Sequence, residues 1–121
     1  MPAPLLITET RHGEALLLAL AGAIDTLNAP AFETRLTELI GEGQRRLVLD
    51  CGSVDYVNSA GLKGFLVAAK ALDAQGGKLA LCGLSSSVRM IFDLIGFSQI
   101  MTILPTAEEA LLFVTAPPVP G

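Results

Sequence analysis

The sequence predicts an α/β fold: a mixed, mostly parallel sheet of about five strands with about four helices, in the order β-β-α-β-α-β-α-β-α. Short apolar runs of the kind that form buried strands alternate along the chain with longer segments whose apolar residues recur at helical spacing. The 121 residues suit one domain, and 51% of them are hydrophobic against 17% charged, which is enough to build a core. Such alternation is typical of right-handed βαβ units.

The first two predicted strands, residues 5–10 (LLITET) and 14–22 (EALLLALAG), form a hairpin. The intervening RHG indicates a turn in which Gly13 is free to adopt a positive φ. His12 falls in this turn, where we expect a solvated residue and no catalytic role.

The apolar run at 15–23 also resembles the core of a secretory signal, because Arg11 and His12 precede it and it ends in small residues. However, Glu9 and Glu14 flank the run, and it is too short to span a bilayer. We therefore interpret it as a buried strand and expect no membrane insertion.

The rest of the chain alternates helices and strands. Helices are predicted where apolar residues recur every three or four positions, and strands where several apolar residues run together. In order, these are helix 29–43, strand 45–51, helix 59–74, strand 78–83, helix 84–96, strand 100–104 and helix 106–114.

Two boundaries and one tail complete the prediction. Asn28 is placed to cap the first helix, and GSVDYV (52–57) is expected to be a linker. Residues 1–115 form the single predicted domain, and the proline-rich 116–121 is predicted to be a flexible tail. The expected core positions of the second and third helices are Leu62, Phe65, Leu66, Ala69 and Leu72, and Val88, Ile91, Phe92 and Ile95.

Charge and cysteine content narrow the class of protein. The net charge of −4 argues against nucleic acid or an anionic membrane as a partner, because both favour a basic surface. Cys51 and Cys82 lie at the ends of apolar runs without C-x-x-C spacing, and His12 is the one histidine, so a zinc site is not expected. We interpret both cysteines as reduced, which predicts a cytoplasmic protein.

No catalytic or cofactor-binding motif is complete. AQGGKLAL lacks the first glycine and the hydroxyl residue of a phosphate-binding loop, and GEGQ follows a helix where a dinucleotide fingerprint follows a strand. One histidine and no G-x-S-x-G leave no Ser-His-Asp hydrolase. The sequence favours a protein that is not an enzyme and that holds no cofactor or metal.

Three polar residues stand out. Asp25 follows the second predicted strand, Asp50 ends the third, and Ser59 begins the second helix after YVN. The carboxyl ends of parallel strands share one edge of a sheet, so these residues are candidate neighbours. Ser59 either caps the helix, is acted on by another protein, or does both.

A two-component receiver domain is one alternative, since Asp50 occupies the position of its phosphorylated aspartate. Receivers also carry an acidic pair after the first strand and a lysine after a late strand. Here AGAID supplies Asp25 alone, and IMTILPTAEE supplies no lysine. The receiver hypothesis therefore rests on analogy of fold alone.

The stretch LVLDCGSVDYVNSAGLKGFL resembles the signature of STAS domains of the anti-sigma factor antagonist type. The matching residues are Asp50, Tyr56, Ser59, Gly61 and Leu62. LAGAID resembles the G-x-x-D motif of the family. VRMIFDLIGFSQIMTIL resembles the third helix and last strand of the family. The resemblance covers roughly residues 5–115 and implies a STAS-like fold.

The resemblance implies partner switching. The unphosphorylated protein would bind and sequester a GHKL-type serine kinase that is otherwise an anti-sigma factor. That kinase would phosphorylate Ser59 and so be released, and a PP2C-type phosphatase would remove the phosphate. A switch of this kind needs no catalytic residue in this chain. One departure is Asn58, where many members carry aspartate directly before the serine.

The second predicted helix supplies a candidate docking face. Its core stripe leaves Lys63 and Val67 pointing outward. Gly64 would let a partner approach the bare backbone closely, or it packs against a neighbouring loop. We expect Asp25, Asp50, Asn58 and Gly61 to surround the switch, and the partner to bind Asn58, Ala60, Lys63, Gly64 and Val67.

A different function within the same fold is also open. A STAS domain can serve as a scaffold or small-ligand accessory of a transport or multi-protein complex. Such a domain would not need a hydroxyl at position 59, so the S-x-G-L motif at Ser59 favours the phosphorylation switch.

Overall fold

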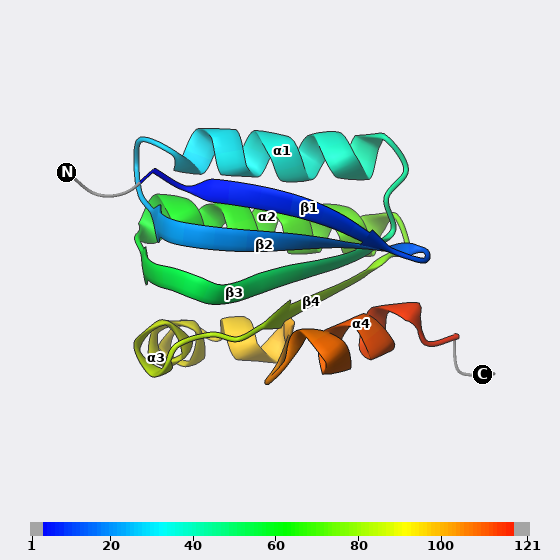
Figure 1. The fold of residues 1–121 in the computed structure, drawn as a ribbon. Helices are drawn as coiled ribbons and strands as arrows, with labels where there is room; N and C mark the ends of the chain where they lie inside the picture. Colours follow the sequence, from blue (N-terminus) through cyan, green and yellow to red (C-terminus); the bar gives the residue numbers. More distant parts are fainter. Residues whose placement is uncertain (1–3, 118–121) are drawn as a thin grey trace.

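The computed structural model describes residues 4–117 and contains the predicted elements in the predicted order (Figure 1). The strands are β1 (Leu6–His12), β2 (Ala15–Ile24), β3 (Arg46–Val57), β4 (Lys78–Cys82) and β5 (Thr102–Leu104). The helices are α1 (Ala29–Gly41), α2 (Ser59–Ala74), α3 (Ser86–Leu94) and α4 (Ala107–Thr115), with a short 3-10 helix, η1 (Phe97–Gln99), before β5. The predicted α/β class is confirmed. Most of the predicted tail, 116–121, lies outside the described residues.

The five strands lie in the sheet in chain order, β1-β2-β3-β4-β5. β1 pairs with β2 antiparallel, and every later pair is parallel. Right-handed crossovers that always step in the same direction place their helices on the same face. Accordingly α1, α2 and α3 cover one face of the sheet, and α4 packs on the other (Figure 1).

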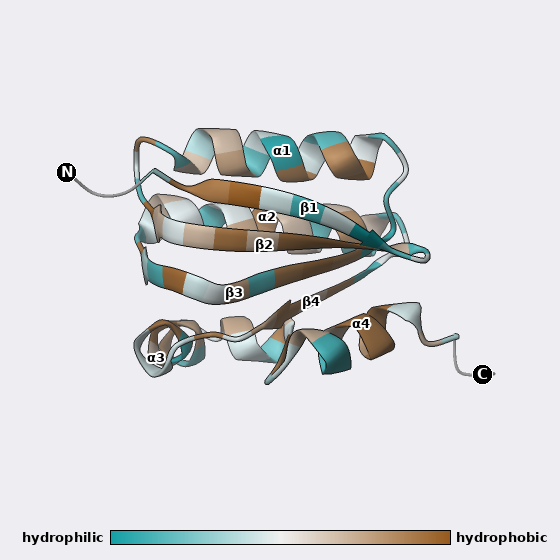
Figure 2. Ribbon diagram, viewed as in Figure 1, coloured by the Kyte–Doolittle hydropathy of each residue, from teal (hydrophilic) through white to brown (hydrophobic). Residues whose placement is uncertain are grey.

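The main core lies between the sheet and helices α1 to α3. Three fully buried rings stack edge to face in its centre: Phe65 of α2 lies 5.0 Å from Phe32 of α1 and 5.4 Å from Phe92 of α3, centroid to centroid. A smaller cluster under α4 contains Val48, Ala80 and Val114. Both faces of the central strands are therefore covered, as their continuous apolar runs predict (Figure 2).

The segment 52–57, predicted to be a linker, is the second half of β3. It pairs with β2 in parallel, Val54 opposite Gly22 and Val57 opposite Ile24, and it bulges twice. At the first bulge the Asp50 carboxylate accepts a hydrogen bond from the Gly52 N–H, 3.0 Å. Bulges bend a strand and raise its twist, so β3 curves away from β4 after Asp50.

Two smaller predictions are also corrected. The hairpin turn is confirmed, with Gly13 at φ +62, but β1 runs through His12, so His12 ends the strand. Ile95, predicted to be in the core, is 48% exposed because α3 ends at Leu94.

The buried stripe of α2 is displaced from the predicted one. Leu62, Leu66 and Ala69 are half-buried, whereas the residues that face α1 and the sheet are Gly61, Gly64, Phe65, Ala68 and Leu72. Three of these five are small, so α1 and α2 can approach each other closely. Hydropathy does not reveal such a surface, because glycine contributes no apolar side chain.

Gly64 is buried against α1 and is not available to a partner, which corrects its predicted docking role. A Cβ at this position would lie 2.9 Å from the ring of Phe32, and that ring is itself locked against Phe65. The structure thus supports packing against a neighbour, although the neighbour is a helix and not a loop.

Gly64→Ala is expected to lower the free energy of unfolding by about 1–2 kcal/mol. Overpacking a core costs about 1–3 kcal/mol, and alanine's better helix propensity returns about 1 kcal/mol at most. Gly41→Ala at the end of α1 is the matched control, because nothing lies within 4 Å of the added Cβ. Urea unfolding should show Gly41→Ala at least as stable as the parent. Equal stability of the two variants would contradict the close packing of α1 on α2.

Both cysteines are buried free thiols. Burial raises the pKa of Cys51, and it raises that of Cys82 to about 11, so both are protonated at neutral pH. A protonated, buried thiol is a poor nucleophile. The buried thiols are therefore poorly reactive, and that they are reduced stays a prediction.

Candidate functional site

Helix α2 begins at Ser59, and Asn58 is its cap. The Asn58 backbone is extended, and its side-chain Oδ1 accepts a hydrogen bond from the Gly61 N–H, 3.1 Å. The Asn58 carbonyl oxygen accepts the first helical bond, from the Leu62 N–H, 2.9 Å. The alternative in which Ser59 itself caps the helix is excluded, because the neighbouring Asn58 is the cap.

Ser59 therefore does not cap the helix. It is exposed in the first turn of α2, and no residue within 4–117 forms a hydrogen bond with its hydroxyl. The helix start adds partial positive charge and N–H groups that have no helical acceptor. The site presents a free hydroxyl in surroundings that suit an anion.

The loop between β2 and α1 is held by a reciprocal pair of side chains. Asp25 Oδ1 accepts from the N–H groups of Leu27, 2.9 Å, and Asn28, 3.1 Å. Asn28 Oδ1 accepts from the Asp25 N–H, 2.9 Å, and its Nδ2 donates to the Ala23 carbonyl, 2.8 Å. Asn28 occupies the N-cap position of α1, as predicted, but its side chain braces the loop and forms no cap hydrogen bond.

The cap of α2 ties this loop to the serine. The Asn58 N–H donates to the Ile24 carbonyl, 3.0 Å, and Asn58 Nδ2 donates to the Thr26 hydroxyl, 3.0 Å. Gly61 lets α2 sit close to both strand ends, since a Cβ there would lie 2.6 Å from Ile24 and 2.9 Å from Val57. The structure therefore brings together the Asp25 loop, Asn58, Ser59 and Gly61.

Asp50 does not belong to this group. It lies in the middle of β3, seven residues before the strand ends at Val57. Because of the two bulges, the stretch from Asp50 to Val57 spans only five residues of β2, Ala19 to Ile24, or roughly 17 Å, so Asp50 does not adjoin Ser59. Its carboxylate shapes the first bulge of β3, and the prediction that it neighbours the switch is wrong.

The other predicted docking residues are exposed to different degrees. Lys63 projects from α2 and is mostly exposed, with Glu33 of α1 at 4.0 Å from its ammonium group. Ala60 and Val67 are half-buried, so each presents only part of its surface. Docking at these positions stays a prediction.

Thr26 and Leu27 are not among the site residues that the sequence predicts. Thr26 holds the loop to Asn58, and Leu27 stands 89% exposed at the tip of the loop. The sequence signal for this ordered loop is the spacing of Asp25 and Asn28, because Asp and Asn side chains commonly form hydrogen bonds with backbone groups two or three residues away.

Asn58→Ala is expected to lower the free energy of unfolding by about 0.5–2 kcal/mol, because it removes the cap of α2. Asn58→Asp should stay close to the parent, since a carboxylate oxygen can still accept from Gly61 and favours the helix N-terminus. Urea unfolding of both variants checks this. An alanine variant as stable as the parent would contradict the capping role.

The rate of Ser59 phosphorylation in Asn58→Asp then reports the effect of the added charge.

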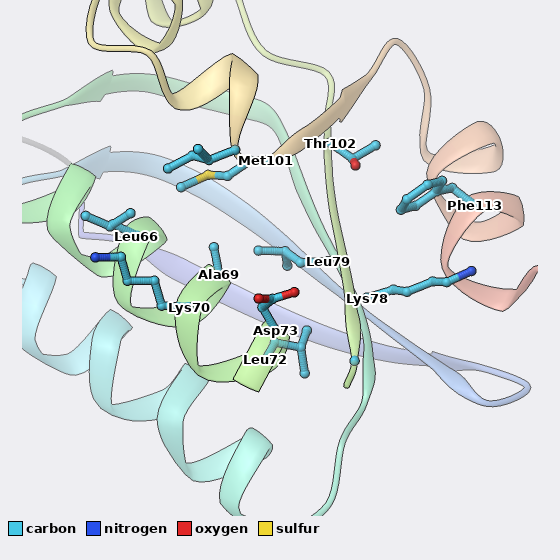
Figure 3. Close-up of a pocket in the computed structure, with 12 residues that line it drawn as sticks. Leu66, Ala69, Lys70, Leu72, Asp73, Lys78, Leu79, Met101, Thr102 and Phe113 are labelled. Carbon is cyan, nitrogen blue, oxygen red and sulfur yellow. The ribbon is translucent and has the colours of Figure 1, made fainter. Parts of the chain in front are cut away.

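A separate pocket of about 470 Å³ lies at the other end of α2 (Figure 3). Its walls come from the last turns of α2, from the start of β4, from Ile100 to Thr102 and from Phe113 of α4. Asp73 lies about 21 Å along the helix axis from Ser59, so this pocket and the serine are distinct places. The Lys78 ammonium already donates to the Ala116 carbonyl, 3.1 Å, and lies 5.5 Å from the Phe113 ring centroid.

Within residues 4–117, no three His, Cys, Asp or Glu side chains are grouped to hold a metal ion. Over the same residues, no helix has both the length and the apolar character to cross a membrane.

The chain folds into a five-stranded α/β sheet with an exposed serine at the start of α2. The family model of the STAS domain matches residues 7–110. The chain belongs to the STAS domain family, as its sequence resemblance predicts.

Known relatives carry one recurring description. The chain is 39% identical over 95 residues to BtrV of Bordetella bronchiseptica, described as an anti-sigma factor antagonist; the match covers 78% of this chain and 82% of that protein. A crystal structure of an anti-sigma factor antagonist from Mycobacterium paratuberculosis superposes with a TM-score of 0.84 at 24% identity, over 94% and 98% of the two chains. The Bacillus protein SpoIIAA in its phosphorylated form superposes with a TM-score of 0.72 at 20% identity, over 92% and 99%.

Proposed function

We propose that this protein is an anti-sigma factor antagonist whose binding is switched by phosphorylation of Ser59. The observation that carries the proposal is that Ser59 is exposed and its hydroxyl is free, while Asn58 caps α2. The relatives named anti-sigma factor antagonists support the general role. A protein of similar fold, SpoIIAA, has a structure in a phosphorylated form, which supports the proposal.

The cycle has two states. The unphosphorylated protein binds and sequesters a GHKL-type serine kinase, which is the anti-sigma factor itself. The kinase transfers the γ-phosphoryl of ATP to the Ser59 hydroxyl, the hydroxyl proton leaves, and ADP remains on the kinase. A PP2C-type phosphatase hydrolyses the phosphoserine and restores the binding form. This protein acts in the cytoplasm as the substrate and ligand of both enzymes and is not itself an enzyme.

The first turn of α2 accepts the phosphate without rearrangement. Phosphate adds about −1.5 to −2 charge and three acceptor oxygens. The free N–H groups and the positive end of the helix dipole stabilise it there. The effect of the modification therefore falls on the partner, through repulsion and through the cost of burying the charge in an interface.

The test uses the GHKL-type kinase that the proposal requires as the partner of this protein. The unphosphorylated protein should form a stable complex with that kinase, and addition of ATP should cause the complex to dissociate. Treatment with a PP2C-type phosphatase should restore the complex. A complex that persists in ATP after stoichiometric phosphorylation would contradict the switch.

The alternative function is a scaffold or small-ligand accessory domain. The pocket beside Phe113 is the observation that favours it, because volumes of 300–1,000 Å³ suit small molecules. That function does not involve Ser59, so a ligand that occupies this pocket equally well in the Ser59→Asp variant would support it.

A further inference from the structure

Leu27 is the most exposed large hydrophobic residue within 4–117, at 89%. A single exposed leucine is ordinary on a mobile surface. Leu27 is different because its backbone is fixed. Its N–H donates to Asp25 Oδ1, 2.9 Å, and Asn28 closes the loop behind it. A loop whose backbone is held in this way loses little conformational freedom when a partner covers the leucine.

Leu27 stands beside the switch. Its neighbour Thr26 accepts a hydrogen bond from Asn58, and Asn58 precedes Ser59. A second large side chain, Tyr56, is 54% exposed on β3, two residues before Asn58. Tyr56 pairs with Ala23 of β2. The Ala23 carbonyl accepts the hydrogen bond from the Asn28 side-chain amide that helps to hold the loop. Two exposed apolar side chains thus lie on the segments that adjoin the serine.

The Tyr56 side chain itself points to the other face of the sheet, because its neighbour Val57 is buried under α1 to α3. We propose that Leu27 is the apolar anchor that this protein inserts into a hydrophobic pocket of the kinase, next to the site from which Ser59 is phosphorylated. This inference rests on the proposed function and specifies the partner's surface: an apolar pocket close to the phosphate donor. Asp25 acts as a positioning residue, since it holds the leucine in place without contacting the partner.

The anchor also explains why the phosphate is effective. Burying Leu27 excludes water from the surroundings of Ser59. A phosphate in that dry surface loses its hydration, and an unpaired buried charge is strongly destabilising. Without the leucine, more water remains and the phosphate is penalised less. Leu27 therefore determines how tightly the unphosphorylated protein binds the kinase. It also determines the factor by which phosphorylation weakens that binding.

The experiment measures the affinity of the GHKL-type kinase used above for four forms of the protein: parent, Leu27→Ala, Leu27→Met and Leu112→Ala. Leu112 is the matched control, a leucine that is 66% exposed on α4. Leu27→Ala should bind about 10- to 100-fold more weakly, as expected for an apolar side chain fully buried in the complex. Leu27→Met and Leu112→Ala should stay within about threefold of the parent, since methionine retains apolar volume.

Two further readouts separate an anchor from a structural residue. The thermal midpoint of Leu27→Ala should equal that of the parent, because the side chain is exposed in the free protein. The ratio of affinities between unphosphorylated and phosphorylated protein should be smaller in Leu27→Ala.

The outcomes distinguish this inference from the function on which it rests. Parent-like binding by Leu27→Ala, together with weak binding by phosphorylated parent, would overturn the anchor and leave the switch standing. Failure of the unmodified parent to bind the kinase would overturn both. An unchanged ratio of affinities in Leu27→Ala would overturn the link between anchor and phosphate.

Discussion

Phosphorylation of Ser59 is expected to weaken binding of the partner kinase by at least about 100-fold and to leave the fold intact. A 100-fold loss corresponds to about 2.7 kcal/mol, which lies in the range for an uncompensated charge forced into an interface. The fold is expected to tolerate the phosphate because the start of α2 favours negative charge. Calorimetric titration of both phosphorylation states, with thermal unfolding of each, checks the two halves of the prediction.

Ser59→Asp tests the same idea without a kinase reaction. Aspartate carries less charge than phosphate, so we expect a smaller loss of affinity, on the order of tenfold. Its stability should match or slightly exceed that of the parent. Ser53→Asp is the control, an exposed serine on β3 away from the start of α2. A large loss of stability in Ser59→Asp would show that the serine is structural.

Phe65→Ala is expected to have the largest effect on stability, about 3–5 kcal/mol. The ring is fully buried, and it links α1 and α3 through edge-to-face contacts with Phe32 and Phe92. Its removal leaves a cavity that three helices would have to close. Urea unfolding should show the loss as a lower midpoint with an unchanged slope.

Phe113→Ala is the control for this substitution. Phe113 is 37% exposed on α4, on the opposite side of the sheet, so the same change should cost much less. Equal losses in the two variants would contradict a core centred on the Phe32, Phe65 and Phe92 rings.

The sequence predicts most of the fold because the elements have clear periodicity. Apolar runs mark β2, β3 and β4, and α4 begins where its helix is predicted, with Thr106 as its side-chain cap. The prediction fails in the second half of β3, where Gly52 and Asp55 interrupt the apolar run. That segment is a strand because β2 pairs with it through two bulges, and pairing partners are not visible in one chain segment.

The site is predicted less completely than the fold. Ser59 is found from its motif, but Asn58 and Ser59 are both good caps, and helix boundaries are uncertain by a residue or two. Asp50 is misplaced because its strand continues past it. Gly64 is misassigned because only the tertiary structure shows that Phe32 fills the space beside it.

The most direct test of the account is to locate the phosphate. The protein is incubated with the GHKL-type kinase and ATP, and the modified residue is mapped by mass spectrometry in the parent and in Ser59→Ala. The account predicts one phosphate, on Ser59, and an alanine variant that binds the kinase but is not modified. Phosphate on Ser53 or on the serines at 85–87, or undiminished modification of Ser59→Ala, would contradict it.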